Sequence, residues 1–138
     1  LLGDGRAVHE DEAREILDHV GLRAHADTEA RNLSHGDQRR LGIAMAIATE
    51  PSVLLLDEPT SGMGPGESRE TVELIQSVQE EMGLTVLMIE HDMEIVLSVS
   101  DRITVLNQGE VLATGTPEAI QGDETVQEAY LGGMREEL

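Results

Sequence analysis

The clearest pattern in the sequence is a run of apolar residues at positions 53–56 that leads straight into two carboxylates, Asp57 and Glu58. Aliphatic residues without polar alternation are typical of a strand buried on both faces, as in parallel sheets covered by helices. Pro59 ends this strand. Because neighbouring side chains of a strand point to opposite faces, the two acids are predicted to take different positions around one ligand at the carboxyl end of the sheet.

Helices are predicted on both sides of this strand. Apolar residues recur at helical spacing over 10–20 and Gly21 follows, which predicts a short amphipathic helix. The segment 34–51 is apolar around most of a helix circumference and therefore predicts a buried helix. A third helix, capped by Gly83, is predicted after the Gly/Pro-rich loop 61–66. Its inward face is formed by Val72, Ile75, Val78 and Met82.

A second buried strand is predicted at 85–89, and His91 follows it closely, so that polar groups again stand at the end of an apolar strand. The order strand, helix, strand predicts a right-handed parallel crossover. After a short helix near 93–98, two apolar segments around 107–110 predict an antiparallel β-hairpin. The segment 116–138 begins with a proline at the first helical position and is predicted to be helical and acidic. Together these elements predict an α/β fold with a parallel sheet, flanking helices and a C-terminal β-hairpin.

The length of 138 residues suits one modest domain and is too short for two cores. We divide the chain into a mostly helical region, 1–50, a core sheet, 51–115, and an acidic tail, 116–138. The first residue, Leu1, is not methionine, and neither a basic flank nor a long apolar stretch follows it. We therefore expect a piece of a longer protein without a signal peptide.

The charge of the chain is strongly negative, at −19, because 28 acidic residues face nine basic ones, all of them arginine. Such a charge repels the backbone of nucleic acids, so we expect no nucleic-acid partner. An acidic surface without lysine also suits concentrated salt, where screening over roughly 3 Å at 1 M removes self-repulsion. We therefore expect a halophilic source, and stability that rises with the concentration of KCl.

Two further absences in the sequence narrow the class of protein. There is no cysteine, which excludes disulfides and thiolate metal sites and suits a cytosolic protein. No apolar stretch approaches the roughly 18 residues of a membrane-spanning helix, so we expect no direct insertion into a membrane. Any role at a membrane then requires a partner.

Three groups of polar residues are candidates for chemistry, and each has a purely structural alternative. Ser34-His35-Gly36-Asp37 opens a helix and is either a plain capping box or, through free backbone N–H groups, a phosphate-binding nest. Asp57 and Glu58 are either a solvated strand end or a pair in which Asp57 holds Mg²⁺ and Glu58 polarises an attacking water. His91 is either structural or catalytic.

The order and spacing of these groups resemble the C-terminal half of an ATP-binding cassette (ABC) transporter ATPase, a P-loop NTPase-like fold. Leu33-Ser34-His35-Gly36-Asp37 resembles the signature motif of this family, and 53–60 resembles its Walker B strand and following loop. The segment 89–92 resembles the region of its switch histidine. The likeness covers nearly the whole chain, which is then one partial nucleotide-binding domain whose signature motif lies in the region 1–50.

The resemblance implies a role for each matching residue. Ser34, His35, Gly36 and Asp37 belong to the motif that holds the γ-phosphate of ATP bound to the opposite subunit of a head-to-tail dimer. Asp57 holds Mg²⁺, mostly through water, and Glu58 is the base that acts on the hydrolytic water. His91 contacts the γ-phosphate. The implied partners are a second nucleotide-binding subunit and membrane permease subunits, on the cytoplasmic face of the cell membrane.

Three departures from the family pattern bear on these roles. The usual signature has a second glycine and a glutamine where this chain has His35 and Asp37. The position that usually carries an aspartate after Walker B is Gly64. The sequence also contains no G-x-x-x-x-G-K-S/T phosphate loop, and no lysine at all. We therefore expect this chain alone to be inactive.

The function predicted from the sequence is an ATP-hydrolysing, energy-coupling subunit of an importer. The segments 61–63, 89–93 and 112–132 are most similar to importers of branched-chain amino acids, and importers of urea or short amides share them. A soluble ABC ATPase of DNA maintenance or translation is a second hypothesis, which the negative charge opposes. A third hypothesis is a non-catalytic remnant without the Walker A half.

Overall fold

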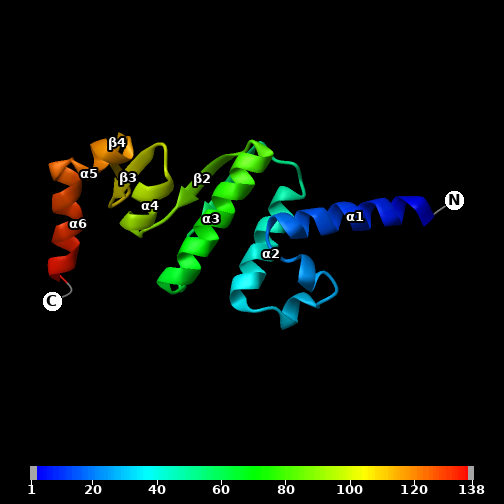
Figure 1. Ribbon diagram of the computed structural model, residues 1–138. Helices are drawn as coiled ribbons and strands as arrows, with labels where there is room; N and C mark the ends of the chain where they lie inside the picture. Colours follow the sequence, from blue (N-terminus) through cyan, green and yellow to red (C-terminus); the bar gives the residue numbers. More distant parts are fainter. Residues whose placement is uncertain (1–2, 137–138) are drawn as a thin grey trace. The chain divides into compact units, whose positions relative to one another are not determined.

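The computed structural model describes the backbone of residues 3–136 and the side chains of residues 9–130. The chain forms two compact units, of which the first ends at Ile89 and the second begins at Glu90 (Figure 1). The division at residues 50 and 115 stays a prediction. Within the described helices, none is long and apolar enough to cross a membrane.

Over its described residues, 3–89, the first unit contains a two-stranded sheet, three α-helices and two short 3₁₀ helices, which Figure 1 shows in chain order. In chain order these are α1 (Gly3–His19), η1 (Arg23–His25), η2 (Ala30–Asn32), α2 (His35–Ile47), β1 (Val53–Asp57), α3 (Pro65–Met82) and β2 (Thr85–Ile89). The strands are parallel and in register from the pair Val53 and Thr85 to the pair Asp57 and Ile89. The predicted parallel pairing is confirmed, and Asp57 lies at the carboxyl end of the sheet.

The core of the first unit lies between one face of this sheet and the helices. Its apolar side chains come from the end of α1, from α2, from β1 and from α3. The buried members are Val20, Leu22, Ile43, Ala44, Ile47, Leu54, Ile75, Val78 and Leu84. Each such aliphatic side chain contributes about 1.5–3 kcal/mol when it leaves water, so this cluster is the main source of stability of the unit.

The other face of the sheet is exposed, which contradicts the prediction that both strands are buried on both faces. Leu54 is 3% exposed, whereas its neighbour Leu55 is 69% exposed. On β2, Leu87 and Ile89 are each 61% exposed. The reason is that the helices of the described residues pack on the Leu54 side, while alternate residues of each strand point the other way. The prediction of two covered faces is therefore wrong for the part of the chain described.

Helix α2 is buried along one side only, and the prediction of a helix buried all round is also wrong. Ile43, Ala44 and Ile47 face the core, whereas Met45 is 67% exposed. Residues on opposite sides of the helix therefore differ in burial although both sides are apolar, because the core of the first unit contacts only one of them.

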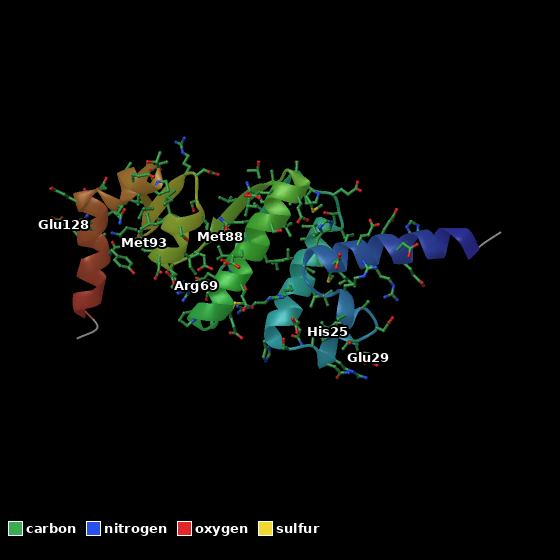
Figure 2. All side chains as sticks on the ribbon, viewed as in Figure 1. His25, Glu29, Arg69, Met88, Met93 and Glu128 are labelled. Carbon is green, nitrogen blue, oxygen red and sulfur yellow. The ribbon has the colours of Figure 1, made fainter. Side chains whose placement is uncertain are left out.

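Helix α3 agrees with the sequence at both ends. Pro65 occupies its first turn, where a missing backbone N–H costs nothing, and the side chain of Glu67 accepts a hydrogen bond from the N–H of Gly64 over 3.3 Å. Arg69, labelled in Figure 2, donates from Nε to the carbonyl of Pro65 over 3.3 Å. Gly83 ends the helix with a left-handed backbone, φ +64°. The inward apolar face that the spacing predicts is confirmed.

The second unit is a β-hairpin with short helices (Figure 1). Its elements are α4 (Met93–Val99), β3 (Ile103–Asn107), β4 (Glu110–Gly115), α5 (Pro117–Gln121) and α6 (Glu124–Glu136). Gln108 and Gly109 both have positive φ, 50° and 84°, as a two-residue type I′ hairpin turn requires. Ile103, Ile120 and Val126 form a second, small core, so the expectation that the chain is too short for two cores is wrong. The predicted hairpin is confirmed.

Candidate functional site

The start of α2 is capped by Ser34. Its backbone is extended, and its hydroxyl oxygen accepts a hydrogen bond from the N–H of Asp37 over 3.1 Å. The same hydroxyl donates its hydrogen to the carboxylate of Asp37, with 2.7 Å between Oγ and Oδ2. The Ser34 half of the predicted capping box is therefore present, whereas the Asp37 carboxylate bonds the Ser34 hydroxyl.

A hollow of about 680 Å³ opens beside this helix start. It is bounded by the first turns of α2, by the loop that follows β1 and by the first turn of α3. The lining residues are Ser34, His35, Gly36, Gln38, Arg39, Ser61, Gly62, Met63 and Glu67. At Gly36 a Cβ atom would meet only the Ser34 hydroxyl, at 4.0 Å, so the backbone here is open to a ligand. Three of the predicted phosphate-binding residues thus share one hollow.

Asp57 and Glu58 lie at a second hollow of the same unit, of about 300 Å³. Its lining comes from the middle of α2 and the end of β1: Arg39, Gly42, Ile43, Ala46, Leu55, Leu56, Asp57, Glu58 and Pro59. Asp57 is the last residue of β1 and is exposed. The structure therefore places the two acids together at this hollow, while Ser34 and Gly36 line the other one.

Glu58 has a left-handed backbone, with φ of +44°. This conformation is uncommon outside glycine and costs on the order of 1–3 kcal/mol, which the surrounding structure has to offset. Its N–H donates to the carbonyl of Ile89 over 2.8 Å, which continues the pairing of the two strands by one residue. Because Glu58 lies beyond the strand, the alternation of a strand does not set the direction of its side chain.

Arg39 was not predicted from the sequence to be a site residue. It lines both hollows, and its Nη1 donates to the carbonyl of Pro59 over 3.3 Å, so it joins α2 to the loop after β1. The next residue, Arg40, pairs with Glu70 on α3 over 3.4 Å. The signal in the sequence was a pair of arginines directly before the apolar part of the helix.

His91 belongs to the second unit and is exposed. It precedes Asp92, which caps α4 by accepting hydrogen bonds from the N–H groups of Glu94 and Ile95. The other predicted site residues all lie on the first unit.

Asp57 is suited to a hard cation that keeps most of its water. Among the described residues, no group of three or more His, Cys, Asp or Glu side chains is arranged to hold a metal ion. Mg²⁺ commonly uses one or two carboxylates together with waters and substrate phosphates, so one exposed carboxylate at a strand end fits it. A phosphate oxygen would then have to supply part of the coordination.

The comparison with known proteins points to one family. Residues 5–61 match the ABC transporter family, and residues 110–135 match the branched-chain amino acid ATP-binding cassette transporter family. The high-affinity branched-chain amino acid transport ATP-binding protein LivG of Escherichia coli K12 is 49% identical over 122 residues, which are 88% of this chain and 48% of LivG. Over 88% of its length the chain is homologous to an ABC transporter ATP-binding protein.

Other ABC proteins agree with this assignment. The corresponding protein BraF of Pseudomonas aeruginosa is 47% identical over 84% of the chain and 46% of its own length. The solved ADP conformation of MJ1267, an ATP-binding cassette of an ABC transporter, has a TM-score of 0.79 at 30% identity, over 88% of this chain and 49% of that one. The ABC ATPase fold predicted from the sequence is confirmed. The chain spans about half the length of the curated ABC relatives it matches.

Proposed function

We propose that this chain is part of the ATP-hydrolysing, energy-coupling subunit of an ABC importer for branched-chain amino acids. The observation that carries the proposal is the pair Asp57 and Glu58 at the carboxyl end of a parallel strand, next to Pro59, whose carbonyl accepts a hydrogen bond from Arg39 of α2. The branched-chain amino acid relatives LivG and BraF support the choice of substrate. A urea or short-amide importer is the alternative.

On this proposal the chain supplies the C-terminal half of a nucleotide-binding domain. The sequence has no lysine, so the phosphate loop and its lysine would lie on a segment outside these 138 residues. The half-length match to the relatives supports this reading. The complete subunit would work as a head-to-tail dimer on the cytoplasmic face of the cell membrane, docked on permease subunits.

The residues of this chain would act by position and charge. Ser34 and the open backbone at Gly36 would receive the γ-phosphate of ATP held by the partner, with His35 and Asp37 beside it. Asp57 would hold Mg²⁺, which supplies positive charge to the phosphates. Glu58, fixed by its bond to Ile89, would accept a proton from the attacking water. His91 would stabilise the charge on the γ-phosphate.

The test is Glu58→Gln in the complete subunit. Loss of the base should reduce phosphate release by about 10²-fold or more, because a positioned base contributes roughly 10²–10⁴-fold. ATP binding should remain, and an ATP-dependent dimer should accumulate in light scattering. The matched control is Glu80→Gln, which removes an exposed acid near the end of α3. At 1.5 Å per residue, Glu80 lies about 20 Å along the helix from Glu67, the residue of α3 that lines the larger hollow. Normal turnover in Glu58→Gln would remove this residue from its assigned role.

We also propose that the protein comes from an organism that lives in concentrated salt, and its acidic surface supports this. The net charge of −19 is distributed along the chain from Asp4 to Glu137. Within the described side chains, the pairs of His9 with Glu12 and of Arg31 with Glu29 join largely exposed residues, and such pairs add little stability. Repulsion among the remaining acids is reduced when salt screens it.

A further inference from the structure

The hydroxyl group of Ser34 is already engaged by Asp37. A serine hydroxyl has one hydrogen, and here that hydrogen is donated to Asp37 Oδ2, 2.7 Å from Oγ. The oxygen lone pairs receive the N–H of Asp37 over 3.1 Å. A phosphate oxygen is an acceptor, so it needs the same hydrogen that the carboxylate holds. The two anions therefore compete for one donor.

The negative charge of Asp37 also opposes the binding of phosphate. A carboxylate in the first turn stabilises α2, because the N-terminus of a helix carries a partial positive charge. It also occupies the electrostatic site that would otherwise attract phosphate. Arg39 is the cationic side chain nearest in sequence, and its Nη1 donates to the Pro59 carbonyl. Glu67 adds a further acid to the lining of the same hollow.

We propose that Asp37 is an affinity-setting residue that opposes the binding of ATP phosphate at Ser34 unless salt screens its charge. The inference rests on the proposed function, because it assumes that the start of α2 receives a phosphate. Engagement requires the Ser34 hydroxyl to turn from Asp37 to the phosphate, which breaks one charge-assisted hydrogen bond and forms another. At roughly 1 M salt, screening over about 3 Å weakens the repulsion that remains. ATP-driven association would then depend on salt through this one side chain.

The experiment uses the complete subunit with Glu58→Gln, in which hydrolysis is stopped. ATP is titrated at low and at molar KCl, and the dimer is followed by light scattering. Asp37→Asn removes the charge but keeps an acceptor and the backbone cap, and Asp37→Ala removes both charge and acceptor. At low salt both variants should lower the half-maximal ATP concentration by about threefold or more, and the advantage should shrink in molar KCl as the charge is screened.

Two controls separate the possible outcomes. Glu80→Gln removes an equal charge far along α3 and should leave the half-maximal ATP concentration unchanged. Ser34→Ala should reduce the advantage of Asp37→Asn, because the contested hydroxyl is gone and only the effect of the charge remains. An unchanged or higher ATP requirement in both Asp37 variants at low salt would overturn the inference while the proposed function stands. If the Glu58→Gln parent forms no ATP-dependent dimer, the proposed function itself fails and the inference falls with it.

Discussion

The N–H of Glu58 donates to the carbonyl of Ile89 over 2.8 Å, although the Glu58 backbone is left-handed, with φ of +44°. This bond, together with the bond from the N–H of Ser61 to the Glu58 carbonyl over 3.1 Å, holds an unfavourable backbone at the residue next to Asp57. Strain of this kind persists only where the surrounding structure determines it, and it is concentrated at functional sites. The bond ties the position of the predicted base to the end of β2.

Because the Glu58 backbone is strained, a substitution that tolerates the left-handed region better should stabilise the fold. Asparagine adopts the left-handed region more readily than glutamine or glutamate. We expect the free energy of unfolding of Glu58→Asn to exceed that of Glu58→Gln by about 0.5–1 kcal/mol. Both variants lose the charge, but only asparagine relieves the strain of the left-handed backbone. Chemical denaturation of the complete subunit measures this difference. Equal midpoints for the two variants would show that the backbone at this position is not strained.

Two glycines of helix α3 predict opposite effects of the same substitution. At both Gly66 and Gly83 an added Cβ meets nothing within 4 Å, so packing does not decide the outcome. Gly83 has φ of +64°, which alanine tolerates poorly, and Gly83→Ala should lower the free energy of unfolding by about 1 kcal/mol. Gly66 lies in the first turn of the helix, and Gly66→Ala should raise this free energy by about 0.5 kcal/mol. Denaturation curves with changes of the same sign would contradict this account.

The net charge of −19 predicts that salt stabilises the protein. The melting temperature of the complete subunit should rise by several degrees between dilute buffer and molar KCl, as followed by circular dichroism. A variant that neutralises three exposed acids, Glu73→Gln, Glu80→Gln and Glu128→Gln, should gain less from the same salt. A melting temperature that does not respond to KCl would exclude adaptation to concentrated salt.

Local features of the fold were predictable where one or two residues determine them. The turn of the hairpin follows from Gln108 and Gly109, since both positions need positive φ and glycine supplies one of them readily. The end of α3 follows from Gly83, and the start of α2 from the hydroxyl of Ser34. The parallel pairing of β1 and β2 follows from a helix between two apolar segments.

Features that depend on packing or on side-chain direction were not predictable. Leu54 and Leu55 have the same chemistry, so the sequence cannot say that one is buried and the other exposed. The left-handed backbone of Glu58 leaves no mark in the sequence, because glutamate is not a residue that favours it. The sequence places Asp37 near Ser34 but does not show that the hydroxyl donates to its carboxylate.

The unpaired edges of the β1–β2 sheet affect how the polypeptide behaves in solution. Each strand pairs on one side only within the described residues, so the sheet has two unpaired backbone edges. Val53-Leu54-Leu55-Leu56 has no charge and no proline, and such a segment pairs readily with strands of other molecules. The acidic surface opposes that association through repulsion between molecules. Salt that stabilises the fold would therefore also weaken its protection against aggregation.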